Sequence, residues 1–250
     1  MNSIVEFLKQ IQGSIYVDEA GKQKILTLVA PLNDQELSAF EASLPCALPE
    51  DMRELLQFAS GLDGAACRLG DRFAIEEVRF ADIQGFGLEE VFPNAKELAV
   101  DGCGNSWIID LTSESKAFAP IFFSCHDPPV IVYQTESLLD FLREVVRGSN
   151  PPWKSEIVDV LDRLTMRIWR ENPCAMSHSQ CLASGDHELK AFAASLDETW
   201  EFIDLRTPKL GDGYSWGRYG SKTGNKRYGS KRIFACQKKP RRRRFLDAFR

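Results

Sequence analysis

Three groups of residues in this chain have side chains that can do chemistry, and the first is built around cysteine. Cys125, His126 and Asp127 follow one another, and Cys103 lies upstream. A thiolate with an imidazole base is the arrangement that cysteine hydrolases use. Adjacent residues on a strand, however, point to opposite faces of a sheet, which keeps Cys125 away from His126. We therefore expect a His-Asp-Pro-Pro turn that closes a hairpin and no catalytic residue, with a cysteine hydrolase as an alternative.

The second group contains the residue types that bind zinc. It consists of Cys174, His178, Cys181 and His187, spaced as C-x3-H-x2-C-x5-H. Thiolate and imidazole ligands suit tetrahedral zinc. The spacing differs from that of a standard zinc finger, and no second cluster accompanies it. We therefore expect a loop with incidental Cys and His between two helices, without a metal or another cofactor, and keep a zinc site as an alternative.

The third group is a basic C-terminal segment in which aromatic residues separate the cations. Residues 206–250 contain 15 Lys and Arg against two acids, Asp212 and Asp247. Because cations neutralise phosphates and aromatic rings stack on bases, this composition is typical of nucleic-acid binding. We favour a tail that is solvated or folds against the acidic part of its own chain, with nucleic-acid binding as the alternative. The candidate contacts are Arg218, Tyr219, Lys222, Arg227, Tyr228, Lys231, Arg241, Arg242, Arg243 and Arg244.

The rest of the chain has the opposite charge. Residues 1–205 carry 16 basic and 34 acidic side chains, whereas the whole protein has a net charge of −5. An acidic surface steers a cationic partner into contact, and it can mimic a phosphate backbone. The candidates for such a surface are Glu76, Glu77, Asp82, Glu89 and Glu90.

Alternating and helical patterns predict the elements that position these residues. Residues 98–111 indicate a hairpin with an Asp/Gly/Asn turn, because glycine and asparagine tolerate the positive φ of tight turns. Asn33 with Glu36 predicts a capping box, and Pro49 suits a first helical turn. Helices are expected near 4–11, 33–44, 49–58, 137–146, 157–168 and 187–196. Strands are expected near 24–30, 77–82, 97–100, 106–111, 120–124, 130–133, 200–205 and 231–236.

Several short motifs, taken in order, resemble a known family. Leu48-Pro49-Glu50-Asp51 precedes the hairpin, and Pro120-Ile121-Phe122-Phe123, His126-Asp127 and residues 136–142 follow it. In that order they resemble the SUKH superfamily, which includes bacterial toxin-immunity proteins and the yeast cell-wall assembly regulator. The resemblance covers roughly residues 30–147. The chain departs from the family pattern at Met52, where an aromatic residue is frequent, and at Ser60-Gly61, where Asn-Gly is frequent.

The resemblance implies a twisted, mainly antiparallel sheet with helices packed on one side, and a binding fold that is generally not catalytic. Residues that match the family's central signature are Asp101, Gly102, Gly104, Asn105, Trp107 and Asp110, and Pro49, His126 and Asp127 match other motifs. We favour a structural role for the hairpin, with Trp107 filling the core. The alternative is that its polar residues, Asp101, Asn105 and Asp110, contact a partner directly.

The predicted fold class is α+β, in two parts. A SUKH-like domain is expected over residues 1–147, a linker over 148–152, and a smaller mixed α/β domain with a basic end over 153–250. The chain has no apolar run near the roughly 20 residues that span a bilayer. Seven cysteines without a C-x-x-C pair, and no signal-peptide core, predict a reduced, cytoplasmic protein.

The predicted function is non-enzymatic protein binding. By resemblance, the leading candidate is a bacterial immunity protein that neutralises a polymorphic toxin, often a nuclease. The alternative is a nucleic-acid-associated protein that binds through its basic C-terminal segment. The sequence predicts no membrane partner.

Overall fold

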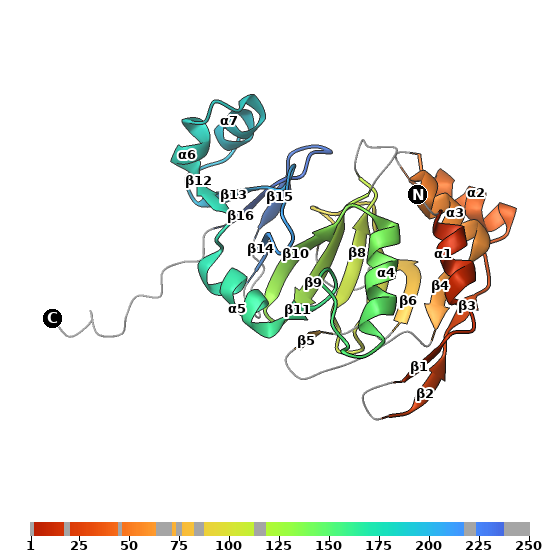
Figure 1. The fold of residues 1–250 in the computed structure, drawn as a ribbon. Helices are drawn as coiled ribbons and strands as arrows, with labels where there is room; N and C mark the ends of the chain where they lie inside the picture. The colour runs from red at the N-terminus through yellow and green to blue at the C-terminus, as the bar shows by residue number, and fades with distance from the viewer. Residues whose placement is uncertain are drawn as a thin grey trace.

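The computed structural model shows an α+β fold around one large sheet (Figure 1). It describes residues 3–17, 21–44, 47–63, 72–73, 77–82, 88–112, 119–217 and 224–237. The helices are α1 (Ile4–Ile11), α2 (Asp34–Ala42), α3 (Glu50–Phe58), α4 (Leu138–Gly148), α5 (Asp162–Glu171), α6 (His178–Leu182) and α7 (His187–Ala194).

Side-chain caps fix where several helices begin. Asn33 accepts a hydrogen bond from the Glu36 amide, and the Glu36 carboxylate accepts one from the Asn33 amide, which confirms the predicted capping box. Ser137 caps α4 by accepting from the Asp140 amide. Pro49 lies at the position just before the first helical residue of α3.

Within the described residues, the central sheet has eight antiparallel strands in the order β14-β10-β9-β8-β7-β6-β4-β3. In chain order these are β3 (Thr27–Val29), β4 (Gly61–Asp63), β6 (Glu77–Asp82), β7 (Ala95–Val100), β8 (Ser106–Asp110), β9 (Ile121–His126), β10 (Pro129–Thr135) and β14 (Gly213–Ser215). The predicted hairpins β7–β8 and β9–β10 are confirmed. The second closes at Asp127-Pro128, because His126 pairs with Pro129.

Three smaller sheets complete the fold. A hairpin joins β1 (Ile15–Val17) to β2 (Gln23–Ile25), and β5 (Arg72–Phe73) pairs with β11 (Val160–Leu161). The third sheet has the order β12-β13-β16-β15. Its strands are β12 (Ala175–Ser177), β13 (Trp200–Asp204), β15 (Asn225–Arg227) and β16 (Ile233–Gln237).

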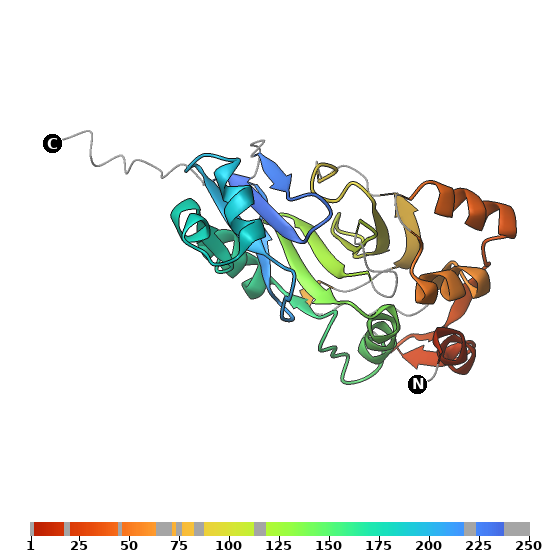
Figure 2. The same cartoon turned by 90° about the horizontal axis from the view of Figure 1, so that it is seen from above.

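The two faces of the central sheet bury different parts of the chain. One face carries Trp107, Phe123 and Val132, which form a core with residues of α1, α3, α4 and α5. The other face carries Ile108, Phe122 and similar side chains, which form a core with Ile203, Tyr214, Phe234 and their neighbours. Figure 2 shows α4 on one side of the sheet and the β13, β15 and β16 strands on the other. α1, α3, α4 and α5 therefore cover one face, and the C-terminal sheet covers the other.

The C-terminal part of the chain thus completes the central sheet. β14 pairs with β10, the register joining Ile131 to Tyr214. No side chain larger than hydrogen fits at Gly213, because a Cβ there would lie 2.0 Å from the Ile131 carbonyl oxygen. The predicted division at residues 148–152 remains a prediction, but the two predicted domains share a sheet and a core.

Three parts of the chain differ from the sequence prediction. The loop expected around Cys174 to His187 contains β12 and α6, because Ser177 and Gln180 form a capping box that starts a helix. The helix expected from Ile157 begins at Asp162, because Ser155 and Glu144 bind the backbone amides of residues 156–158 instead. The strand expected over 24–30 is divided at Leu26, whose side chain is buried and whose amide donates to the Ser14 carbonyl.

Candidate protein-binding site

The β7–β8 turn is organised by Asp101 and Asn105. Asp101 Oδ1 accepts hydrogen bonds from the backbone amides of Cys103 (2.7 Å) and Asn105 (3.0 Å). Its Oδ2 accepts one from Asn105 Nδ2 at 2.7 Å. Gly102 and Gly104 take positive φ values of 67° and 90°, which favour glycine. Both polar side chains are buried, so they hold the turn from inside.

Asn105 also ties this turn to the neighbouring β9–β10 turn. Its Oδ1 accepts a hydrogen bond from the His126 amide at 3.1 Å and lies 2.9 Å from His126 Nδ1. A Cβ at Gly104 would lie 3.1 Å from His126 Cε1, so the two turns are in close contact. The exposed residues they present together, 102–104 with His126 and Asp127, are called the loop surface below.

Trp107 lies directly under this arrangement. Its side chain is fully buried on the helix-covered face, and its ring centroid lies 4.8 Å from that of Phe123. The burial expected from the hairpin pattern is therefore present. Because the ring is enclosed, Trp107 stabilises the sheet and does not reach a partner.

These motifs lie in a segment that matches a family model. A family model, described as SMI1 / KNR4 family (SUKH-1), matches residues 31–144. Residues 31–144 are therefore similar to the SUKH-1 family and are called the SUKH-1 segment below. No curated protein and no solved structure matched the chain. SUKH proteins are protein-binding modules of the immunity or regulator kind and are generally non-catalytic.

At the far end of β8, the SUKH-1 segment forms a buried ion pair with the C-terminal sheet. Asp110 Oδ2 lies 2.8 Å from Arg227 Nη1, and the exposed fractions of the two side chains are 0% and 2%. Arg227 also donates to the carbonyls of Val91, Ser230 and Lys231. Asp110 was a candidate for direct partner contact, and Arg227 was a candidate for nucleic-acid contact. Both are occupied inside the protein, so we assign neither to a binding surface.

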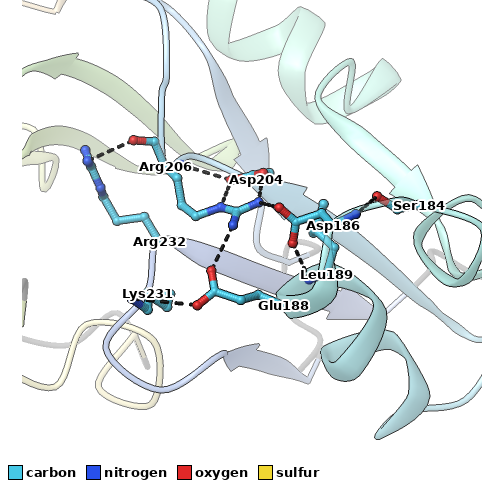
Figure 3. A network of polar contacts seen from close by, with 8 residues as sticks. All are labelled: Ser184, Asp186, Glu188, Leu189, Asp204, Arg206, Lys231 and Arg232. Atoms are coloured by element: carbon cyan, nitrogen blue, oxygen red, sulfur yellow. Dashed lines mark hydrogen bonds and ion pairs between the residues drawn. The ribbon is translucent and has the colours of Figure 1, made fainter.

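Several other described members of the basic segment also contact neighbours within the chain. Arg206 binds the carboxylates of Asp204, Asp186 and Glu188 at 2.6–2.8 Å (Figure 3). Hydrogen bonding of the Arg206 guanidinium to the Asp204 carboxylate is the largest of several causes that raise the pKa of Arg206 above its usual value.

Three further basic or aromatic residues of this segment contact other parts of the same chain. Arg232 pairs with Glu136. It also donates to the Arg206 carbonyl, and Figure 3 shows this second contact. Lys231 Nζ lies 3.7 Å from Glu188, and the ring of Tyr228 lies 5.2 Å from that of Phe192. Much of the described basic segment therefore neutralises acids of its own chain. The remaining candidates lie outside the described residues: Arg218, Tyr219, Lys222, Arg241, Arg242, Arg243 and Arg244.

The acidic candidates are placed only in part. Glu89 and Glu90 are exposed in the turn before β7. Glu77 and Asp82 begin and end β6, but their side chains lie outside the described residues, as does Glu76 altogether. Over the described chain, no helix has both the length and the apolar character needed to cross a bilayer.

The four zinc candidates make different contacts, and one of them, His187, is the first residue of α7. Cys181 is buried in the core beneath α6 and α7, whereas Cys174 packs against the core under the C-terminal sheet. His178 Nε2 lies 3.0 Å from the carbonyl oxygens of both Ala193 and Leu196. In the part of the chain that the structure describes, no three His, Cys, Asp or Glu side chains gather closely enough to hold a metal ion.

Cys125 is expected to resist alkylation in the folded protein. Its thiol faces the helix-covered core, where burial raises its pKa to about 12, and a thiol is a poor nucleophile unless it ionises. Cys103 lies exposed on the loop surface. Mass spectrometry after iodoacetamide treatment at neutral pH should therefore find Cys103 modified and Cys125 modified only in denaturant. Equal labelling rates for the two thiols in the native protein would contradict this.

Proposed function

We propose that this protein is a non-enzymatic immunity protein that binds a polymorphic toxin, often a nuclease, through the loop surface. The match of residues 31–144 to the SUKH-1 family is the observation that carries the proposal. The loop surface supports it, because buried side chains fix both turns before any partner arrives. A surface fixed in advance loses little conformational entropy on binding.

The acidic charge of residues 1–205 also supports a nuclease toxin as the partner. The excess of acids over residues 1–205 favours encounter with a cationic protein, and nucleic-acid-cleaving enzymes are basic where they hold phosphates. Asp127 places a carboxylate on the loop surface itself, and Glu89 and Glu90 add exposed acids elsewhere on the SUKH-1 segment.

The proposal is tested by co-expressing this protein with the product of the gene directly upstream, taken as the toxin candidate. Co-expression should rescue growth, and the purified pair should form a 1:1 complex by size-exclusion chromatography. Asp127→Arg should weaken the complex by roughly tenfold or more, because like charges at an interface cost several kcal/mol. Asp34→Arg, at an exposed acid of α2, is the matched control. Unchanged affinity for Asp127→Arg would exclude the loop surface, and the absence of both rescue and complex would exclude the toxin assignment.

We expect no nucleic-acid complex at physiological ionic strength. Arg206, Arg227 and Arg232 are paired with carboxylates of the same chain, so releasing them for phosphate contacts would break those pairs. A gel shift with full-length protein and a random oligonucleotide checks this. A salt-sensitive, sub-micromolar complex that is lost when residues 238–250 are deleted would instead support binding through the basic end.

A further inference from the structure

A pocket of about 270 Å³ lies where strand β10 of the central sheet meets the C-terminal part of the chain, away from the loop surface. Its walls come from β10, the segment before α5, α5 itself and the loop before β14. These elements lie together at the lower left of Figure 1. The volume is below that of a typical small-molecule site and is closer to the size of one long side chain.

One residue that lines the pocket, Gln134, has a buried acceptor without a partner among the described residues. Gln134 is 3% exposed, and its Nε2 donates to the Tyr133 carbonyl at 3.1 Å. Its Oε1 has no hydrogen-bond partner among the described residues. Gln134 lies at an irregularity in the β9–β10 register, between Tyr133 and Thr135, and such bulges redirect side chains. An unpaired buried carbonyl oxygen is costly, so a ligand that supplies an N–H donor would be stabilised there.

One wall of the pocket is fixed in advance by Glu144. Its Oε2 accepts hydrogen bonds from the Ser155 hydroxyl and the Glu156 amide, each at 2.8 Å. Burial alone would raise the pKa of Glu144, but these hydrogen bonds and the charge of Arg147 outweigh it and lower the pKa below its usual value. Glu144 therefore stays ionised at neutral pH and holds the residues before β11 against α4.

The remaining lining is acidic with apolar patches. Glu156, Asp159 and Asp212 contribute carboxylates, against the single cation Arg167 among the described lining residues. Asp159 accepts a hydrogen bond from the Ser155 amide and Asp212 accepts one from the Lys209 amide, and a carboxylate can accept several hydrogen bonds. Leu164 and Leu210 also line the pocket, and Leu210 is 52% exposed. These surfaces suit an aliphatic stem that ends in a cationic donor.

We propose that this pocket binds an arginine side chain of a protein partner. The guanidinium fits because it has five N–H donors in a planar fork, no acceptor and a permanent charge. One donor reaches Gln134 Oε1, the others meet the carboxylates at the rim, and the methylenes lie against Leu164 and Leu210. The partner rests on the proposed function, since it requires that the protein bind another protein.

A small probe tests the pocket without the partner. Isotope-labelled full-length protein is titrated with Nα-acetyl-arginine amide, following the Gln134 side-chain amide and the Gly211 backbone amide by NMR. We expect saturable shifts at both. The citrulline analogue, which has nearly the same shape but no charge, should bind about tenfold more weakly or worse, since hydrogen bonds between charged groups exceed neutral ones.

Variants separate the pocket from the rest of the surface. Gln134→Leu removes the acceptor at similar volume and should abolish the shift at Gly211. Glu156→Gln changes an exposed acid without endangering the fold and should weaken binding severalfold, whereas Glu89→Gln, outside the pocket, should have no effect. If Gln134→Leu does not fold, the affinity of Glu156→Gln for the arginine probe decides whether the pocket is the binding site.

Equal binding of the citrulline analogue, or no saturable shift at the highest soluble concentration, would overturn the pocket assignment. Because the titration contains no toxin, that result leaves the proposed function standing. Conversely, saturable binding of the probe together with no toxin complex would retain the pocket and reject the immunity role.

Discussion

Arg227→Ala is expected to lower the free energy of unfolding by about 3–5 kcal/mol, the range measured when one partner of a buried ion pair is removed. The substitution leaves the Asp110 carboxylate buried without its cation and removes donors from three backbone carbonyls. It also removes a guanidinium that lies 5.4 Å from the ring centroid of Phe234. Urea denaturation followed by tryptophan fluorescence measures the change.

Two controls isolate the buried charge. In the double variant Asp110→Leu with Arg227→Met, no charge remains buried, so much of the lost stability should return. Arg143→Ala removes an ion pair with Asp140 whose side chains are 44% and 51% exposed, and should cost about 1 kcal/mol or less. If Arg227→Ala and Arg143→Ala cost the same, the ion pair does not hold the C-terminal sheet on the SUKH-1 segment.

Trp107→Ala is also expected to cost about 3–5 kcal/mol, because removing a buried aromatic ring forfeits its burial and leaves a cavity. The ring is completely enclosed and packs on Phe123 beneath the loop surface. The thermal unfolding midpoint should fall by many degrees. Partner binding should weaken only through loss of folded protein, since Trp107 does not reach the surface.

Ile15→Ala is the matched control for this prediction. Ile15 is a large apolar residue of β1, but its side chain is 60% exposed, so its loss should change stability by about 0.5 kcal/mol or less. A thermal midpoint that is the same for wild type and Trp107→Ala would remove Trp107 from the core.

The two substitutions remove different kinds of contact: packing within the central sheet and an ion pair between distant segments. Trp107 stabilises the sheet within the SUKH-1 segment, whereas Arg227 joins that segment to a strand 117 residues away from Asp110 in the sequence. Combining the two variants should give nearly additive losses, because the side chains belong to opposite faces of the sheet.

The sequence alone determined the local structure around the candidate site. Asn33 with Glu36 specified a helix start, and Gly102 and Gly104 specified the central turn, because caps and positive φ depend on residues close together in the chain. The aromatic residue after the turn likewise indicated that Trp107 fills the core. The order of these motifs was enough to indicate the SUKH family.

Tertiary structure alone decided which polar residues remain available to a partner. Asp101 and Asp110 look alike in the sequence as acids of one hairpin, but one organises a turn and the other neutralises Arg227. The opposite charges of residues 1–205 and 206–250 indicated pairing within the chain, but charge totals do not say which side chains meet. The unpaired acceptor of Gln134 likewise depends on the β9–β10 register. Burial and long-range pairing are set by packing between distant segments, which local patterns do not encode.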